Sequence, residues 1–335
     1  MKILVTGGAG FIGSHFVKLA LEKKEVTKVV NLDKLTYAGN LSTLKMIEKN
    51  PKYEFVKGDI ADPLIVDEIY KKGIDTVVNF AAETHVDRSI KNAGDFIQTD
   101  VKGVFVLLEA ARQYGLKKFI QISTDEVYGS IAKGHATEES PLMPSNPYSA
   151  SKAGGDRLAF SYFKTYNIPV IVTRASNNYG PFQYPEKLIP LFITNALENK
   201  KLPMYGDGLY RRDWIYANDH CEAIWFLINK GTDGEIYNIG GGNEKTNWDI
   251  TDFILKKLNL DKSVVQSVKD RPGHDRRYAL SCNKINALGW APKVNFEEGL
   301  DKTIDWYKAT ENWWKPIKDG EYKKYYEEHY GSHKA

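Results

Sequence analysis

The feature that most constrains the fold is an apolar segment at the start of the chain that runs directly into a glycine-rich turn. Residues Met1–Thr6 are typical of a short buried strand, and the next seven residues read Gly-Gly-Ala-Gly-Phe-Ile-Gly. A helix is predicted from Phe11 to about Lys24, followed by a second strand over Lys28–Leu32. These are the parts of a parallel βαβ unit. The sequence therefore predicts an α/β protein built on a doubly wound parallel sheet.

The glycine spacing and a downstream carboxylate indicate what this turn binds. Gly8, Gly10 and Gly13 fit G-x-G-x-x-G, and Gly7, Gly10 and Gly13 fit the looser G-x-x-G-x-x-G. Without side chains, such a turn is tight and its backbone N–H groups can approach a pyrophosphate. Asp33 lies 20 residues beyond Gly13, where it would accept hydrogen bonds from the ribose of NAD and repel the extra phosphate of NADP. The pattern predicts a Rossmann sheet that binds NAD, against the alternative of a purely structural glycine turn.

Two further strands place small and polar residues at the same edge of the sheet. Tyr53–Lys57 is the predicted third strand, and Asp59 and Ile60 follow it where adenine should lie. Asp75–Phe80 is the predicted fourth strand, and the small residues after it would let a cofactor pass close to the backbone. The polar residues beyond lie where a sugar is expected: Thr84, His85 and Asp87. Each of these three is equally compatible with an ordinary turn.

The stretch from Ile120 to Lys152 supplies the candidate chemical groups. Residues 118–123 are typical of a buried strand, and a hydroxyl and two carboxyls stand where it would end: Thr124, Asp125 and Glu126. Open α/β sheets hold their ligands at this edge. The alternative is an ordinary acidic strand end that caps a helix.

A tyrosine and a lysine follow on one predicted helix. Pro147 favours a helix start, which places Tyr148 in the first turn and Lys152 one turn later on the same face. A tyrosine normally ionises near pH ~10. A neighbouring ammonium and the positive helix end both favour the phenolate. We therefore expect Tyr148 to act as a base near neutral pH, whereas the alternative is that two surface residues share a helix face by chance.

Composition excludes several classes of function. The net charge is +3 and the basic residues are scattered or paired, which argues against nucleic-acid or membrane binding. The two cysteines, Cys221 and Cys282, lie far apart, and the seven histidines show no His-x-x-x-His pattern on a helix, so we expect neither a disulfide framework nor a metal site. The chain begins with a strand instead of a signal peptide, and no apolar run approaches about 18 residues. A cytoplasmic protein is expected.

A long helix predicted over Gly94–Tyr114 suggests a homodimer. It carries two apolar stripes, one with Ile97, Val101, Val104, Leu108 and Ala111, the other with Phe96, Leu107 and Ala110. A helix that is apolar on two faces needs two partners, and we expect the sheet and a second subunit. The helix beginning at Tyr148 is the expected companion, since it is apolar around Leu158, Ala159, Phe160, Tyr162, Phe163 and Tyr166.

The length of 335 residues allows a large domain and a smaller one. We expect residues 1–178, with a returning segment at about 208–240, to form the NAD-binding domain. Residues 179–207 and 241–335 should form a smaller α+β substrate-binding domain. Helices are predicted near 188–200, 219–229, 248–258, 283–288 and 297–309, with a terminal helix marked by Tyr322, Tyr325, Tyr326 and His329.

Over nearly its whole length the sequence resembles the extended short-chain dehydrogenase/reductase family, and within it the dTDP-glucose 4,6-dehydratases. The shared motifs are the opening glycine turn, Ala81–Ile90, Ser123–Gly129, Tyr148–Lys152, Ser176–Pro181, Pro185–Pro190 and Arg271–Tyr278. The most specific is Thr124-Asp125-Glu126, because related sugar-nucleotide epimerases usually lack the paired acids. Thr84 departs from the Ser common in the family but keeps the hydroxyl.

The resemblance implies two sets of binding residues. The NAD set is Gly7, Gly10, Phe11, Ile12, Gly13, Asp33, Lys34, Leu35, Thr36, Asp59, Ile60, Ala81, Ala82, Glu83, Thr99, Tyr148, Lys152, Asn178 and Tyr179. The set for the nucleotide sugar is Thr84, His85, Asp87, Thr124, Asn178, Lys187, Leu188, Pro203, Met204, Tyr205, Arg212, Asn247, Asp270, Arg271 and His274. Arg212 is the candidate for the diphosphate because a guanidinium offers forked charged donors. Its alternative is a surface ion pair.

The resemblance also implies a mechanism with catalytic residues Thr124, Asp125, Glu126, Tyr148 and Lys152. Tyr148 would take the C4 hydroxyl proton of dTDP-glucose while hydride passes to NAD, Glu126 would take the C5 proton, and Asp125 would protonate the departing C6 hydroxyl. Hydride would then return to C6 and give a 4-keto-6-deoxy sugar. Three alternatives stay open: an NAD-dependent nucleotide-sugar 4-epimerase, a dehydratase that acts on UDP-glucose, and a non-catalytic NAD-binding sensor or scaffold.

Overall fold

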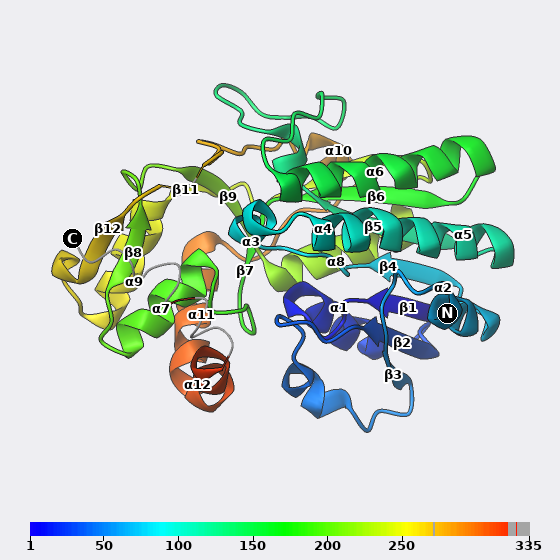
Figure 1. The fold of residues 1–335 in the computed structure, drawn as a ribbon, viewed down its shortest axis with the longest axis horizontal. Coiled ribbons are helices and arrows are strands. Elements are labelled where there is room, and N and C mark those ends of the chain that lie inside the picture. Colours follow the sequence, from blue (N-terminus) through cyan, green and yellow to red (C-terminus); the bar gives the residue numbers. More distant parts are fainter. Residues whose placement is uncertain (271, 321–325, 327–335) are drawn as a thin grey trace.

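The structure, a computed structural model, describes residues 1–270, 272–320 and 326 and is built around one parallel sheet (Figure 1). Its seven strands follow the order β10-β6-β5-β4-β1-β2-β3, and every neighbouring pair is parallel. The strands are β1 (Lys2–Thr6), β2 (Lys28–Asp33), β3 (Tyr53–Lys57), β4 (Thr76–Asn79), β5 (Lys118–Thr124), β6 (Val170–Ala175) and β10 (Ile236–Ile239). The predicted doubly wound sheet is confirmed.

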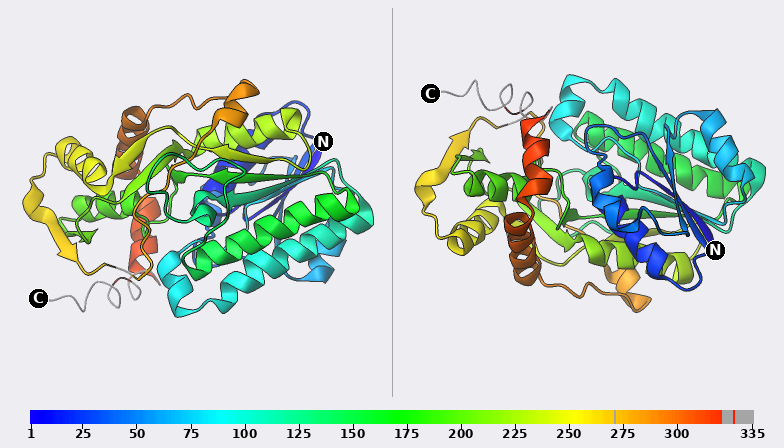
Figure 2. Two further views of the ribbon diagram at one scale, coloured as in Figure 1. Left: turned by 90° about the horizontal axis from the view of Figure 1, so that it is seen from above. Right: turned by 90° about the horizontal axis from the view of Figure 1, so that it is seen from below.

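Helices cover both faces of this sheet, as the two views of Figure 2 show. One face carries α1 (Phe11–Glu22) and α8 (Ala217–Lys230), and the other carries α2 (Pro63–Lys71), α5 (Val104–Tyr114) and α6 (Pro147–Tyr166). Alternation along β1 explains the two cores: Ile3 and Val5 pack with the first pair of helices, whereas Leu4 packs with the others. Because both faces are buried, the strands carry continuous apolar runs such as Ile3–Val5 and Val170–Val172.

The predicted helix Gly94–Tyr114 is not regular. It consists of α4 (Gly94–Phe96), a π-helical turn over Ile97–Gly103 and α5. Along α5 both predicted stripes are buried inside the subunit, in a core shared with α2 and α6. The chain itself therefore supplies the second partner that the sequence assigned to another subunit. Ile97 and Phe105 remain 53% and 45% exposed.

The remaining elements form a smaller part, called the cap here, at one end of the sheet (Figure 1). Its strands are β7 (Asn177–Tyr179), β9 (Arg211–Tyr216) and β11 (Glu244–Thr246) in one sheet, and β8 (Leu202–Tyr205) with β12 (Val265–Val268) in another. Its helices are α7 (Leu188–Leu197), α9 (Asn247–Leu258), α11 (Phe296–Ala309) and α12 (Glu311–Asp319). Two short helices, α3 (Val86–Lys91) and α10 (Asn283–Ala287), complete the assignment together with 3-10 turns at Leu41–Ile47, Asp125–Tyr128 and Lys262–Val264.

The chain enters the cap through Asn177 and returns to the main sheet later than expected. The sequence placed the return at about residue 208, but β9 pairs with β7 and β11 in the cap sheet. The return begins with α8, which packs on α1, and ends with β10 beside β6. Of the predicted terminal helix, Tyr322, Tyr325 and His329 lie outside the described residues. The sequence also missed α12, whose Trp314 is fully buried and donates to the Tyr307 carbonyl at 2.8 Å.

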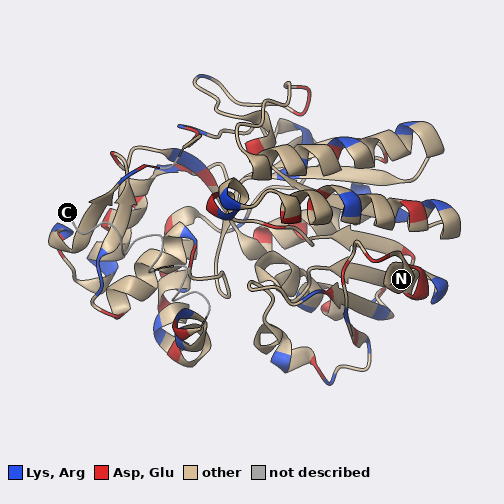
Figure 3. Cartoon of the chain, viewed as in Figure 1, with Lys and Arg blue, Asp and Glu red and all other residues tan. Residues whose placement is uncertain are grey.

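Within residues 1–270, 272–320 and 326, no helix is both long enough and apolar enough to cross a bilayer. The same residues contain no cluster of three or more histidine, cysteine or acidic side chains able to hold a metal ion. Figure 3 shows lysine and arginine distributed over both parts of the molecule and interspersed with acidic residues.

Candidate active site

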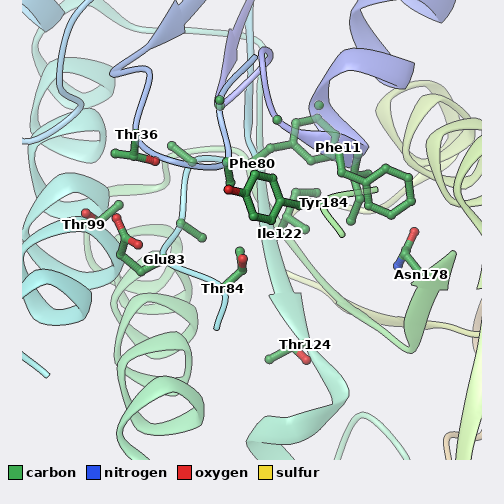
Figure 4. A pocket seen from close by; sticks show the side chains of 18 of the residues that line it. Phe11, Thr36, Phe80, Glu83, Thr84, Thr99, Ile122, Thr124, Asn178 and Tyr184 are labelled. Atoms are coloured by element: carbon green, nitrogen blue, oxygen red, sulfur yellow. The ribbon is translucent and has the colours of Figure 1, made fainter. Parts of the chain in front are cut away.

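Two cavities meet at the carboxyl edge of the main sheet. The first, called the sheet-edge cavity, has a volume of about 290 Å³ and lies over the ends of β1, β2, β4 and β5 (Figure 4). The second, called the cap cavity, has a volume of about 160 Å³ and lies between the segment after β4 and the cap. The residues that line both are Thr84, Glu126, Asn177, Glu186 and Lys187. A molecule in one cavity would therefore contact a molecule in the other.

The glycine turn brings backbone to the wall of the sheet-edge cavity. Gly7 has φ +67°, a left-handed conformation that glycine adopts without strain, and a Cβ there would lie 2.7 Å from the Ala81 nitrogen. A Cβ on Gly13 would lie 2.3 Å from the Gly7 carbonyl oxygen, so only glycine lets α1 begin this close to β1. The expected close approach is confirmed, and it leaves room for a pyrophosphate at the N-terminus of α1.

Asp33 ends β2 at the same cavity. Its carboxylate accepts hydrogen bonds from the Ala9 and Leu35 N–H groups, both at 2.8 Å, and these contacts fix its orientation. Burial raises its pKa, which the two N–H groups partly offset. A carboxylate held rigidly at the end of β2 is placed as the ribose of a dinucleotide requires.

The end of β5 carries the three predicted polar residues in order. The Thr124 side chain caps the following 3-10 turn by accepting from the Glu126 N–H at 3.3 Å. Asp125 is 3% exposed, and its Oδ1 accepts from the Thr124 hydroxyl at 3.2 Å. Burial, followed by the neighbouring Glu126 charge, raises the pKa of Asp125 well above its ordinary value. Burial thus favours the protonated form of Asp125. The Glu126 carboxylate lines both cavities and accepts from the Tyr278 hydroxyl at 3.3 Å.

Tyr148 and Lys152 line the sheet-edge cavity from the first turns of α6. Asn146 caps this helix in a capping box with Ser149, and Pro147 follows at its first position, as predicted. The Lys152 ammonium is 6% exposed and donates to the Ile122 carbonyl at 2.8 Å. Burial lowers the pKa of Lys152, so its proton is held less tightly than that of a free lysine.

The electrostatics of Tyr148 differ from the sequence expectation. Burial, followed by the charges of Glu126 and Asp100, raises the pKa of Tyr148 well above 10, although a hydrogen bond with Thr124 lowers it in part. The expectation of a phenolate favoured by Lys152 and the helix end is therefore wrong for the protein alone. It failed chiefly because Tyr148 is buried, and also because Asp100 approaches from another segment; the local pattern revealed neither.

A buried ion pair holds α6 against the end of β5. Arg174 on β6 is 1% exposed and donates to both oxygens of Asp156, at 2.8 and 3.1 Å. The same guanidinium donates to the Tyr128 hydroxyl at 2.8 Å. Asp156 lies one turn beyond Lys152, and Tyr128 ends the turn that carries Glu126. The pair therefore fixes the helix with Tyr148 relative to the turn with the two carboxyls.

The cap cavity gathers charged side chains from distant segments. Arg212 on β9 is 7% exposed, donates to the carbonyls of Arg211 and Asp275 at 2.8 Å, and lies 4.2 Å from the centre of the Tyr278 ring. Its guanidinium is thus buried and held by carbonyls, which disfavours the surface ion pair. His274 pairs with Asp270 at 2.7 Å and stacks on Tyr210.

Comparison with known proteins agrees with this geometry. The sequence model of the protein family described as GDP-mannose 4,6 dehydratase matches residues 4–303 of this chain. A dTDP-glucose 4,6-dehydratase of Streptomyces niveus is 50% identical over 95% of this chain and 96% of its own length. The chain belongs to the dTDP-glucose 4,6-dehydratase family.

Solved members of the family have the same fold. The dTDP-glucose 4,6-dehydratase DesIV of Streptomyces venezuelae, with NAD and TYD bound, superposes with a TM-score of 0.92 at 49% identity, covering 95% of this chain and 100% of that one. The enzyme of Bacillus anthracis, in complex with NAD, superposes with a TM-score of 0.89 at 52% identity, covering 95% and 99%.

The structure brings most of the expected binding residues of a family member together. The NAD set lines the sheet-edge cavity except for Leu35 and Tyr179. Tyr179 is fully buried among Trp214, Tyr216 and Phe296, because its side chain alternates into the cap core along β7. Leu35 packs against the core beneath the turn after β2.

The nucleotide-sugar set divides between the two cavities. Thr124 and Asn178 line the sheet-edge cavity, and the cap cavity is lined by Thr84, His85, Asp87, Lys187, Leu188, Pro203, Tyr205, Arg212, Asn247 and His274. Met204 is 2% exposed and points into the cap core, and Asp270 is not on the cavity wall but holds His274. Arg271 lies outside the described residues.

Sequence reasoning missed other residues that line the cavities. Asn177, one position before Asn178, lines both cavities, and its Oδ1 is buried without a hydrogen-bond partner among the described residues. Successive side chains of a strand point to opposite faces, so strand alternation would have assigned Asn177 and Asn178 to different faces. Glu186 also lines both, with 1% side-chain exposure, and accepts from the Tyr37 hydroxyl at 3.0 Å. The pattern of segment Pro185–Pro190 contained Glu186 but gave no reason to select it.

Proposed function

We propose that this protein catalyses the NAD-dependent dehydration of dTDP-glucose to dTDP-4-keto-6-deoxyglucose. The observation that carries the proposal is that Asp125, whose protonated form burial favours, lies beside Glu126 where the two cavities meet. An acid and a base side by side are what the removal of water requires. The relatives named above are dTDP-glucose 4,6-dehydratases, and their sequences align with almost the whole of this chain.

NAD fits the sheet-edge cavity on the protein's own features. Gly7 and Gly13 leave a space that a Cβ would fill, Asp33 is oriented for ribose hydroxyls, and Lys152 lies at the inner end with Tyr148. When bound there, NAD would accept a hydride from C4 and return it to C6. The side chains that would flank its nicotinamide half are Ala81, Ala82, Glu83 and Thr99.

Tyr148 is the proposed base for the C4 hydroxyl. Its hydroxyl shares a hydrogen bond with Thr124, and both side chains line the cavity. The raised pKa of Tyr148 in the protein alone means that it needs a cation beside it to ionise. Lys152 and the positive nicotinamide ring would supply that charge. Thr124 would hold the C4 oxygen during the transfer.

Glu126 and Asp125 are the proposed base and acid of the elimination. Glu126 reaches both cavities and would remove the C5 proton once C4 is a ketone. Asp125 would give its proton to the departing C6 hydroxyl, because burial keeps that proton in place until a stronger acceptor arrives. The assignment uses the two different environments of neighbouring carboxyls.

The cap would hold the nucleotide sugar. Arg212 presents a guanidinium whose other donors are already fixed on backbone carbonyls, so it can bind a diphosphate without reorganisation. Lys187 donates to the Thr84 carbonyl at 2.6 Å at the junction of the cavities. The proposed division is an NAD-binding domain of residues 1–176 with a returning segment from α8 to β10, and a nucleotide-sugar-binding domain from the rest.

We further propose a homodimer that forms through the outer side of the π-helical turn, α5 and α6. Fewer apolar side chains support this dimer than the sequence suggested. Three remain exposed on neighbouring helices: Ile97 at 53%, Phe105 at 45% and Tyr166 at 48%. Sedimentation at low concentration would contradict the proposal if only monomer were found. The cytoplasmic location stays a prediction.

A direct assay separates the alternatives. The protein is incubated in parallel with dTDP-glucose and UDP-glucose, and product mass and C4 configuration are measured. Loss of water from dTDP-glucose supports the proposal, and faster loss from UDP-glucose would reassign the base. Inversion at C4 without loss of water would indicate an epimerase, and no turnover at all would favour a non-catalytic binding protein.

A further inference from the structure

At the end of the proposed reaction, on which this inference rests, one proton lies on Tyr148 although the next turnover needs it on Asp125. The C4 hydroxyl proton ends on Tyr148, and the Asp125 proton leaves with the C6 hydroxyl as water. The C5 proton taken by Glu126 returns to C5, and the hydride removed from C4 ends on C6, so both are balanced within the substrate. After one turnover Tyr148 holds a proton that it must lose, and Asp125 lacks the proton that it needs.

One hydroxyl lies between the two groups. The Thr124 side chain shares a hydrogen bond with Tyr148, and its Oγ1 donates to Oδ1 of Asp125 at 3.2 Å. A hydroxyl both donates and accepts, so it can take a proton from one neighbour while giving its own to the other. Thr124 is at the last position of β5 and caps the next turn, which holds it in place (Figure 4).

We propose that the Thr124 hydroxyl is a proton relay that resets the enzyme by passing the Tyr148 proton to Asp125 after each turnover. In this step the Tyr148 O–H bond breaks and a bond forms to Thr124 Oγ1. The original Thr124 O–H bond breaks as its proton joins Asp125 Oδ1. Tyr148 becomes the phenolate and Asp125 the acid, with no net change of charge and no external donor.

The burial of both ends explains why an internal route matters. Asp125 is 3% exposed and Tyr148 9%, and the substrate would cover them further. The other charged groups that face Asp125 are Glu126 on its own turn and Arg212 and Asp213 on β9. None of these can supply the proton: Glu126 is the proposed base for C5, and the Asp213 carboxylate accepts from the Gly241 and Asn243 N–H groups. A guanidinium does not deprotonate. Exchange with solvent through Lys152 is the competing route for Tyr148.

The test compares the first turnover with later ones. Thr124→Val removes the hydroxyl at nearly constant shape, Thr124→Ser keeps it, and Thr173→Val is a control at a fully buried threonine on the neighbouring strand β6. Each variant is equilibrated with NAD, mixed with dTDP-glucose and followed by rapid quench. Losing the relay should slow later turnovers at least ~10-fold more than the first, the lower end of what proton transfer groups contribute. The Thr124→Val progress curve should then show a burst of one product per active site.

Two further measurements separate a relay from simple positioning. Higher buffer concentration at constant pH should speed the slow phase of Thr124→Val, because a buffer can both take the Tyr148 proton and supply one to Asp125. Thr124→Ser should abolish the burst. If the first and later turnovers of Thr124→Val slow by the same factor, Thr124 only positions the substrate and the relay is wrong. A burst in Thr173→Val would equally overturn it, because the effect would not be specific. If the wild-type protein forms no dehydrated product, the proposed function fails instead.

Discussion

The two cavities are built in different ways. The sheet-edge cavity is shaped by backbone: Gly7 and Gly13 allow chain segments to approach within distances that any Cβ would prevent. The cap cavity is shaped by side chains: Arg212 rests on two carbonyls, and His274 is held by Asp270. The first cavity draws mainly on the ends of β1, β2, β4 and β5 and the segments that follow them, whereas the second joins the segment after β4 to separate stretches of the cap.

This difference predicts how each cavity responds to substitution. Changing a side chain in the cap cavity should affect one ligand contact at a time, because its neighbours are held independently. The sheet-edge cavity should tolerate side-chain changes better than any added bulk on its glycines. Thr124, Asp125 and Tyr148 line the sheet-edge cavity beside Glu126, which lines both cavities. These four residues should respond differently from the rest of either cavity, since substitutions there affect chemistry more than binding.

The largest effect is expected for Tyr148→Phe in the sheet-edge cavity. Without the hydroxyl, the C4 oxidation loses its base, and the rate of hydride transfer should fall by ~10⁴-fold, the upper end for general base catalysis. NADH absorbance after mixing with dTDP-glucose measures this step, and NAD affinity should change little. Transient NADH at the wild-type rate would place the base elsewhere.

The next effect concerns the two carboxyls. Glu126→Gln should still oxidise C4 but scarcely exchange the C5 proton with deuterated solvent, whereas Asp125→Asn should oxidise and exchange yet lose water slowly. Each overall rate should fall by ~10²–10⁴-fold. NADH absorbance and deuterium at C5 are followed together, and both variants should accumulate NADH. Wild-type dehydration in both would make the carboxyls structural.

Arg212→Lys tests the side-chain character of the cap cavity. Lysine keeps the charge but loses the fork, so the KM for dTDP-glucose should rise ~10-fold or more while the dissociation constant of NAD stays the same. Arg276→Lys is the matched control, because Arg276 forms an exposed ion pair with Asp207. Equal effects in the two variants would contradict the assignment of Arg212 to the diphosphate.

Asp33→Ala tests side-chain selectivity in the sheet-edge cavity. The carboxylate should favour NAD over NADP, and its removal should narrow that preference by about tenfold, equivalent to one lost charged hydrogen bond. Binding of both cofactors is measured by titration. A preference for NAD that survives unchanged would show that backbone alone discriminates between them.

Glu83 gives the smallest effect, on stability. Burial, then the charge of Asp100, raises its pKa from 4.5 to about 7. The folded state thus favours the protonated carboxyl of Glu83. The contribution of this carboxyl to the stability of the fold is fully present below pH about 4.5 and is lost as the pH rises through about 7. Glu83→Gln should therefore be more stable than wild type at pH 8 by about 1 kcal/mol, after a discount for partial exposure, and not at pH 4. Thermal unfolding measures this, with Glu68→Gln on the exposed side of α2 as control.

The sequence predicted the sheet-edge half well because its signals are local. The strand, glycine turn and Asp33 lie within one βαβ unit, and the capped helix with Tyr148 follows its own start signal. The ionisation of Tyr148 was predicted wrongly, chiefly because its burial depends on the tertiary fold and also because Asp100 approaches from another helix. In the cap, short strands such as β7 and β9 give too little periodicity to assign. Their contribution, including Asn177 and the late return of the chain, depended on tertiary pairing.

The π-helical turn at Ile97–Gly103 acts as a phase shift within one helix. A regular α-helix advances about 100° per residue, and a π turn contains one residue more than an α turn. The stripe that ran through Ile97, Val101 and Val104 in the sequence is therefore not one stripe: Ile97 faces outward and Val104 is buried. Deleting a single residue from this turn would restore a regular helix and rotate either Thr99 away from the cofactor or α5 out of the core. Insertions and deletions here should be far less acceptable than substitutions, even though the segment lies at the surface.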